Sequence, residues 1–266
     1  MNYKALPSGA TVLSVFAVTV LIVAPSLGQG RGAQAGPPPS PKDAAPMDLT
    51  GYWVSIVTED WRYRMVTPAK GDYASVPLNA EGRKVADTWD PTKDEASGNQ
   101  CKSYGAAALM RVPGRLHITW ADDNTLKIET DAGTQTRLLH FGAAQPSGGE
   151  PTWQGSSAAL WDVPPPGRGM GGGAAVRPGQ PRAGTLKVVT TRMRPGYLRK
   201  NGVPYSGNAT VTEYFDRTNE PNGDSWLIVT TIVNDPQYLQ QEFVTSTHFK
   251  RQADATGWAP TTCEAR

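Results

Sequence analysis

The sequence lacks the short motifs that mark several large classes of enzyme. It has no serine nucleophile motif, phosphate-binding loop, dinucleotide fingerprint or metalloprotease helix. Hydrolase and redox chemistry are therefore less expected, although an unusual enzyme is not excluded. The sequence also lacks a block of basic residues, and its formal net charge is only +2. A nucleic-acid partner is not expected, because such partners require a concentrated positive charge.

Cysteine is scarce, with only Cys101 and Cys263 in the whole chain. In an exported protein, two cysteines most simply form a disulfide bond. This bond would tie the C-terminal tail to the end of the first long loop. Two free thiols are the alternative. A catalytic cysteine is not expected, because an oxidising compartment would have to keep it reduced.

The N-terminal residues have the pattern of a secretion signal. Lys4 gives a basic start, residues 10–24 form an apolar run, and small residues at 26–28 or 33–35 suit cleavage. An uncleaved membrane anchor is the alternative, but the run is short for a bilayer span of about 20 residues. We therefore expect a signal peptide over residues 1–28, a periplasmic or secreted protein, and no membrane span after cleavage.

Two further segments have compositions that do not favour a packed fold. Residues 29–46 consist largely of Gly, Pro, Ala and Ser, which predicts a flexible tether. Residues 164–183 are of low complexity and predict a disordered insertion at the tip of a hairpin. The remaining chain, residues 47–266, is long enough to bury the core of one domain.

Alternation of apolar and polar residues predicts a chain made mostly of strands. The expected strands cover residues 53–58, 107–112, 115–121, 125–130, 135–141, 156–163, 185–193, 209–215, 225–233 and 244–250. One short helix over 79–88, capped by Asn79, is expected inside the long segment 66–100. Because no βαβ alternation occurs, the chain is all-β, as a sandwich or a barrel. Consecutive strands favour an antiparallel up-and-down barrel of nine or ten strands, which leaves no open edge.

Several short blocks resemble known β-barrel proteins. Gly51 and Trp53, at the start of the first strand, resemble the opening Gly-x-Trp of lipocalin-like, or calycin, barrels. Further blocks are similar to an abundant and mostly uncharacterised family of secreted bacterial proteins: residues 184–186, 201–206, 212–215 and 235–236. This resemblance implies a lipocalin-like barrel and export, but no reaction. The chain departs from the family at Tyr205, where many relatives have His, and at Tyr214, where they often have Arg.

Charged and aromatic side chains gather at the end of the first strand. Trp61, Arg62 and Arg64 would form a rim that grips a polar head group, since arginine can hold a carboxylate with two parallel hydrogen bonds. A solvated charged turn is the alternative. Arg199 and Tyr205 lie in the connector between two later strands, around the tight turn Asn201-Gly202. We expect both regions to form the mouth of a ligand cavity.

Two charged residues occur on otherwise apolar faces of strands. Arg137 alternates with Leu139 and Phe141, and Glu213 shares a face with Phe215. A buried charge is costly unless it is paired. The two residues are therefore either part of an ion pair or an acid/base group inside a cavity, or the apolar faces are simply imperfect.

The three histidines, His117, His140 and His248, fall on three different expected strands. Such a trio can bind zinc and leave a position open for water. No short ligand pair such as His-x-His is present, so a chance trio is the favoured interpretation, and no metal or other cofactor is expected. If the protein is an enzyme, Glu213, His140 and His117 are the candidate acid/base residues.

These observations support three hypotheses about function. The first is a periplasmic or secreted barrel that binds a small apolar or amphipathic ligand in its cavity. The chain has eight Trp and nine Tyr, which suit an aromatic or apolar ligand, although aromatic residues also fill ordinary cores. The second is an enzyme on the same barrel, using acid/base residues and possibly a metal. The third is a structural or assembly protein of the cell envelope without a cavity.

Overall fold

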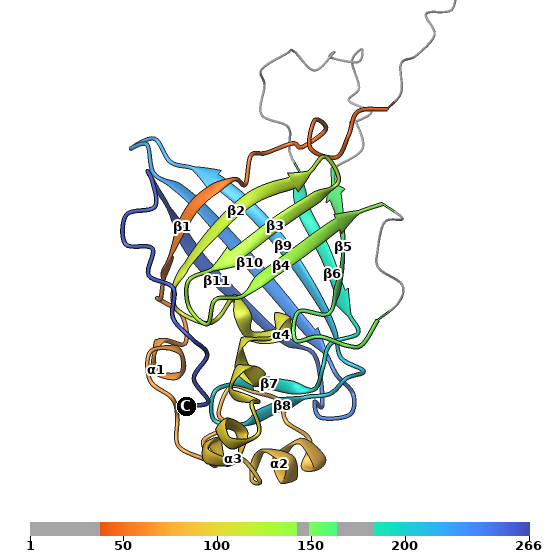
Figure 1. Cartoon of the computed structure of the whole chain (residues 1–266), viewed down its shortest axis with the longest axis vertical. Coiled ribbons are helices and arrows are strands. Elements are labelled where there is room, and N and C mark those ends of the chain that lie inside the picture. Colours follow the sequence, from red (N-terminus) through yellow and green to blue (C-terminus); the bar gives the residue numbers. More distant parts are fainter. Residues whose placement is uncertain (1–37, 143–148, 164–183) are drawn as a thin grey trace, which may run out of the picture. The chain divides into compact units, whose positions relative to one another are not determined.

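Nine strands close into a barrel in the computed structural model (Figure 1), which describes residues 38–142, 149–163 and 184–266. Their order around the barrel is β1-β11-β10-β9-β6-β5-β4-β3-β2, and β2 pairs again with β1. The barrel strands are β1 Gly51–Ile56, β2 Arg115–Asp122, β3 Thr125–Thr130, β4 Thr136–Phe141, β5 Ser156–Asp162, β6 Thr185–Thr191, β9 Thr210–Asn219, β10 Ser225–Asn234 and β11 Phe243–Gln252.

One pair of neighbouring strands in the barrel is parallel. A closed ring with an odd number of strands cannot alternate in direction throughout, and here the exception is β4 with β5, where Leu139 lies opposite Ser157. All the other pairs in the barrel are antiparallel. The expected closed barrel is therefore confirmed, but the expected purely antiparallel up-and-down order is wrong. The connection from residue 142 to residue 155 carries the chain back to the end where β4 began.

Side chains fill the interior of the barrel. The inward positions include Trp53, Ile118, Leu139, Phe215 and Leu227, all of which have no exposed surface, and they belong to one apolar cluster. A cavity large enough for water would leave exposed area on the side chains around it. These five residues therefore surround no space in which a ligand could bind.

The helices and a small hairpin cover one end of the barrel, which we call the helical end (Figure 1). A second apolar cluster lies there; Leu78, Leu198, Val203 and Leu239 belong to it. The elements of this end are α1 Trp61–Arg64, α2 Ala80–Ala86, α3 Pro91–Ala96, η1 Gln100–Tyr104 (a 3-10 helix), α4 Ala106–Leu109, and the hairpin of β7 Gly196–Arg199 with β8 Val203–Tyr205.

The helical end has more helix than the sequence predicts. The expected helix is present as α2, with the side chain of Asn79 accepting a hydrogen bond from the backbone NH of Gly82. The expected strand over 107–112 is wrong, because Ala106–Leu109 forms α4. Alanine favours helix over strand, and this alanine-rich turn is buried between the two apolar clusters.

The connector between β6 and β9 is ordered, and it contains the hairpin of β7 and β8. Gly202 in its turn has φ +84°, a left-handed conformation that glycine adopts without strain. Trp89 packs so closely against this glycine that an added Cβ would overlap its side chain. The expected tight turn at Asn201-Gly202 is therefore confirmed, and it packs against the segment between α2 and α3.

Cys101 on η1 and Cys263 in the C-terminal tail form a disulfide bond, as predicted. The bond holds the tail against the helical end. Among the described residues, none of the helices has the length and apolar character that crossing a bilayer requires. The expected signal peptide and the expected insertion 164–183 lie outside the described residues, as does the first half of the expected tether, residues 29–37.

Candidate functional site

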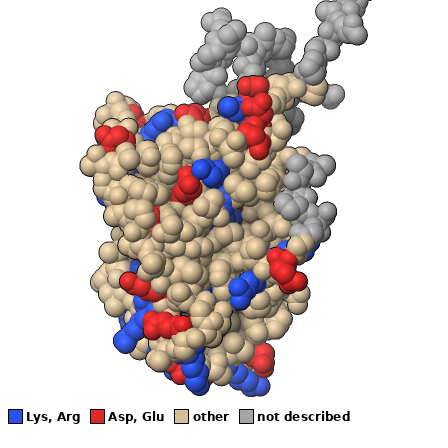
Figure 2. Space-filling view, in the orientation of Figure 1, with Lys and Arg blue, Asp and Glu red and all other residues tan. Residues whose placement is uncertain are grey.

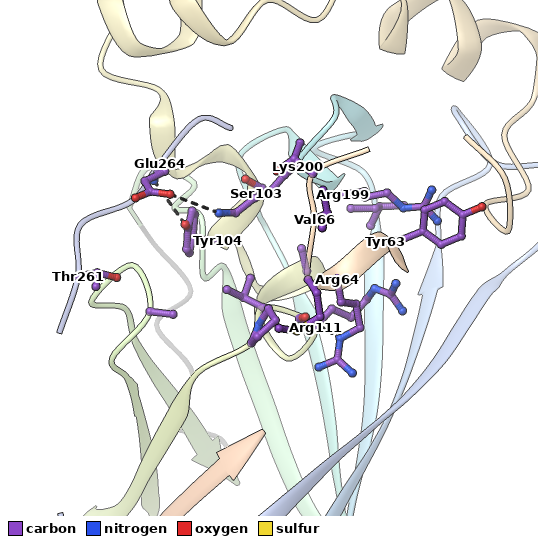
Figure 3. A pocket seen from close by; sticks show the side chains of 17 residues that line it. Tyr63, Arg64, Val66, Ser103, Tyr104, Arg111, Arg199, Lys200, Thr261 and Glu264 are labelled. Atoms are coloured by element: carbon purple, nitrogen blue, oxygen red, sulfur yellow. Dashed lines mark hydrogen bonds and ion pairs between the residues drawn. The ribbon is translucent and has the colours of Figure 1, made fainter. Parts of the chain in front are cut away.

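A cavity of about 380 Å³ lies at the helical end, and we call it the end cavity (Figure 3). Its walls come from α1, η1, α4, β7 and the C-terminal tail. Its cationic side chains are Arg64, Arg111, Arg199 and Lys200. Apolar side chains such as Val66, Val112 and Leu198 complete the lining. This volume is at the small end of the range that small-molecule sites occupy.

Three of the cations are almost completely buried. The exposed fraction is 8% for Arg64, 7% for Arg111 and 5% for Arg199. Figure 3 shows Arg64 and Arg111 close together, while the end of Arg199 faces the ring of Tyr63. Water would screen these charges if they lay on the surface. Buried guanidinium groups instead need partners in the protein or in a ligand.

Two acidic residues before α1 neutralise two of these arginines. Glu59 pairs with Arg64, and Oδ2 of Asp60 lies 3.1 Å from Nη2 of Arg111. Asp60 has φ 50° and ψ 26°, a left-handed conformation that Asp tolerates better than most residues. This backbone geometry at the start of α1 places Asp60 beside Arg111, while Glu59 contacts Arg64.

Arg199 has no carboxylate in contact among the described residues. Its Nη2 donates to the carbonyl oxygen of Ala74 at 2.8 Å, and its Nη1 lies 3.5 Å from the carbonyl oxygen of Asp72. Its guanidinium carbon lies 4.3 Å from the centre of the Tyr63 ring. Its acidic neighbours Asp60 and Asp72 have other partners, because Asp60 pairs with Arg111 and Asp72 pairs with Arg62. Arg199 therefore contributes a buried positive charge that no acid in contact neutralises.

The three arginines repel one another. Burial, followed by the positive charge of Arg111, lowers the pKa of Arg199 to about 10. Burial also lowers the pKa of Arg64, and the charge of Arg111 acts in the same direction, against the opposing effect of Glu59. An anion between these groups would relieve the repulsion.

The C-terminal tail forms the opposite wall. The disulfide bond at Cys263 places Thr261 and Glu264 against the cavity. The carboxylate of Glu264 lies 4.0 Å from Nζ of Lys200, and the backbone NH of Glu264 donates to Oη of Tyr104 at 3.4 Å (Figure 3). Without the disulfide bond, this wall would lose its covalent link to η1.

The structure brings two of the predicted ligand-binding residues to the end cavity, Arg64 and Arg199. Arg62 instead extends to Asp72, and Trp61 has an exposed fraction of 63% on the surface of α1. Tyr205 is completely buried in the second apolar cluster. The expected regions at the end of the first strand and in the connector therefore meet at one cavity, but not through all of the predicted side chains.

Arg137 and Glu213 lie inside the barrel. They form an ion pair in which both side chains are fully buried, with Nη1 and Nη2 of the arginine 3.0 and 2.6 Å from the two carboxylate oxygens. Nη2 also donates to Oγ1 of Thr190 at 3.3 Å. The ion-pair interpretation is confirmed. With no exposed surface on either side chain, the pair has no access to a substrate.

The three histidines stay apart on outward positions of the barrel. His117 stacks on Tyr52 with ring centres 4.1 Å apart, His140 lies near Thr125, and Nδ1 of His248 lies 3.2 Å from Oε2 of Glu59. The described part of the chain holds no group of three or more His, Cys, Asp or Glu side chains that could share a metal ion. The zinc interpretation therefore has no geometric support among these residues.

Arg111 is the buried arginine of the end cavity that the sequence did not mark as a candidate; Lys200 and Glu264 were not candidates either. It follows the alanine-rich α4, in a segment expected to be a strand. A signal was present, because an arginine between Met110 and Val112 is a charge in an otherwise apolar run. Such a charge requires a partner when the run is buried.

On the face shown in Figure 2, Lys and Arg are interspersed with Asp and Glu, and no large area carries one sign of charge. The arginines described above are a buried cluster beneath this mixed surface.

Searches of protein-family models, curated proteins and solved structures found no significant match to the chain. The resemblance to lipocalin-like proteins therefore remains a prediction.

Proposed function

We propose that this protein binds a small amphipathic molecule that carries an anionic group, and that it does so in the end cavity. The observation that carries the proposal is Arg199, a buried cation beside a second buried arginine, with no carboxylate partner in the described part of the chain. An anionic group would supply the missing countercharge, and the apolar lining suits the rest of the molecule. Because side chains fill the barrel, the proposed site is at its helical end.

Binding of paired compounds by the purified protein tests this proposal. Isothermal titration calorimetry with octanoate, octyl phosphate and the neutral octanamide compares the same apolar body with and without a charge. We expect at least one of the anions to bind, and octanamide to bind about tenfold more weakly or not at all, because a charged hydrogen bond contributes about 1.5–3 kcal/mol. Equal binding of all three compounds would show that the arginines do not select the ligand.

A pair of variants locates the site. Arg199→Gln should weaken binding of the anion, whereas Arg83→Gln should leave it unchanged, because Arg83 is an exposed arginine of α2 at the same end that does not line the cavity. Melting temperatures of both variants show whether each has folded. If Arg83→Gln weakens binding as much as Arg199→Gln in folded protein, the ligand is attracted by general charge and not held in the cavity.

A structural role in the cell envelope is the second candidate, and the filled interior of the barrel favours it.

We also propose that the protein works outside the cytoplasm, since structural disulfide bonds such as Cys101–Cys263 persist in oxidising compartments. Membership of a lipocalin-like family is part of the same proposal. Gly51 and Trp53 at the start of β1 and the closed barrel support it, whereas nine strands differ from the eight of lipocalins.

A further inference from the structure

The arginines of the end cavity differ in how many of their nitrogens are already bonded. Arg64 has none free: Nε donates to the carbonyl oxygen of Arg111 at 2.9 Å, Nη1 pairs with Glu59, and Nη2 donates to Oγ of Ser55 at 3.2 Å. Arg64 therefore positions the backbone of Arg111, and each of its three nitrogens already has a partner in the protein.

Arg111 and Arg199 each have a buried nitrogen without a hydrogen-bond partner. In Arg111, Nη2 bonds to Asp60 and the buried Nη1 has no partner among the residues described. In Arg199, Nη1 and Nη2 face the carbonyl oxygens of Asp72 and Ala74, and Nε has no partner within the same residues. Both side chains line the end cavity and are more than nine-tenths buried. A buried donor without a partner is costly, so the protein leaves the charge of these two guanidinium groups incompletely compensated beside the cavity.

The charge around the cavity is unbalanced by one unit. Glu59, Asp60 and Glu264 contact Arg64, Arg111 and Lys200, respectively. Among the described residues, the remaining cation in the wall is Arg199; Asp60 beside it pairs with Arg111, and Asp72 pairs with Arg62. A ligand with one negative charge would complete the balance. A ligand with two would place an excess negative charge near three carboxylates in a region of low dielectric constant.

We infer that the ligand of the end cavity is a monocarboxylate whose negative charge compensates the guanidinium groups of Arg111 and Arg199. This inference rests on the proposed function and narrows it to one class of acid. The single ionisation of a carboxylate matches the one unit of unbalanced positive charge, and a guanidinium group pairs well with a carboxylate. The carbon skeleton would lie against Val66, Val112 and Leu198. Val66 has an exposed fraction of 66%, so the apolar end of the ligand would reach the rim of the cavity.

Three probes with a common aromatic body distinguish the possibilities: phenylacetate has one negative charge, phenyl phosphate has two, and phenylacetamide has none. Calorimetry is done on the wild-type protein at about pH 8, where phenylacetate and phenyl phosphate are fully ionised. We expect phenylacetate to bind about tenfold more tightly than either of the other probes. Tighter binding of phenyl phosphate would overturn the monocarboxylate but leave the proposed anion site in place. If none of the three binds at millimolar concentration, and octanoate and octyl phosphate also fail, the proposed function itself is wrong.

Variants test the two arginines. Arg111→Gln and Arg199→Gln should each weaken phenylacetate binding about tenfold, because each removes one of the two positive charges. Neither should weaken binding of phenylacetamide to the same degree. Arg83→Gln, at an exposed arginine of α2 that does not line the cavity, is the matched control and should retain the wild-type affinity. Arg111 also pairs with Asp60, and if Arg111→Gln does not fold, the comparison of the three probes on the wild-type protein still decides the inference. Unchanged phenylacetate affinity in a folded Arg199→Gln variant would overturn it.

Discussion

Arg137 on β4 and Glu213 on β9 meet inside the barrel, with Nη2 of the arginine 2.6 Å from Oε2 of the glutamate. Glu213 lies between Val211, which belongs to the apolar cluster of the helical end, and Phe215, which belongs to the cluster of the barrel. Thr190 accepts a further hydrogen bond from Arg137. The ion pair therefore forms a polar layer between the two apolar clusters.

Removing one member of this pair should destabilise the protein strongly. Glu213→Leu would leave the guanidinium of Arg137 buried without its countercharge, at a cost of about 3–5 kcal/mol in the free energy of unfolding. The double variant with Arg137→Met and Glu213→Leu should cost clearly less, because no buried charge remains. Urea unfolding of the wild type and the variants measures both effects. A double variant as unstable as Glu213→Leu alone would show that the pair is needed for more than charge neutralisation.

The disulfide bond should stabilise both the fold and the end cavity. Cys101 and Cys263 are 162 positions apart, and closing so long a loop typically contributes about 2–5 kcal/mol. Reduction should therefore lower the melting temperature. It should also weaken binding of octanoate, because the tail that carries Glu264 is a wall of the cavity.

The double variant with Cys101→Ala and Cys263→Ala is the control for this experiment. Its melting temperature should match that of the reduced wild type and should not respond to the reductant. If the reductant leaves the wild-type melting temperature unchanged while free thiols appear on labelling, the bond does not contribute to stability.

The barrel could be predicted from the sequence, because alternation along a strand is a local pattern. Residues 115–121 and 125–130 alternate clearly, and both are strands in the structure, β2 and β3. The parallel pair of β4 and β5 could not be predicted, because it depends on which way the connection after residue 142 returns. Whether two neighbouring strands of a closed barrel run parallel or antiparallel depends on the order of all the strands. The sequence of a single strand does not determine it.

The end cavity was predictable only in part. The position of Arg64 after the first strand and of Arg199 in a long connector marked both as candidates. Arg111 was hidden because the sequence around α4 was interpreted as a strand. Its partner Asp60 lies 51 positions away, and nothing local in the sequence indicates that contact. The charge balance on which the proposal depends is therefore visible only once the fold is known.

Gly105 and Tyr205 are packed so closely that a methyl group on Gly105 would overlap the phenol oxygen. Gly105→Ala should therefore lower the free energy of unfolding by about 1–3 kcal/mol, the usual cost of overpacking. Tyr205→Phe should be neutral or stabilising, because Oη has no hydrogen-bond partner among the residues described. Urea unfolding of each single variant gives both values.

The double variant tests whether the phenol oxygen is the group that opposes Gly105→Ala. On the Tyr205→Phe background, the cost of Gly105→Ala should be smaller, although a residual cost remains because the new methyl group also meets the carbonyl oxygen of Trp153 at 2.9 Å. Strictly additive effects would contradict the close packing, since residues in contact normally show coupling.

The stability of the protein should fall in alkaline solution because of its buried tyrosines. Burial and a 2.7 Å hydrogen bond to Asp87 raise the pKa of Tyr73 to about 12. Burial, together with Asp94, also raises the pKa of Tyr197. Between about pH 10 and pH 12, the unfolded chain has lost the proton of Tyr73 while the folded protein retains it, so the free energy of unfolding decreases as pH rises. Urea unfolding across this range should show the decrease. Tyr73→Phe should make the decrease shallower, and an identical slope in the variant would mean that Tyr73 ionises equally in both states.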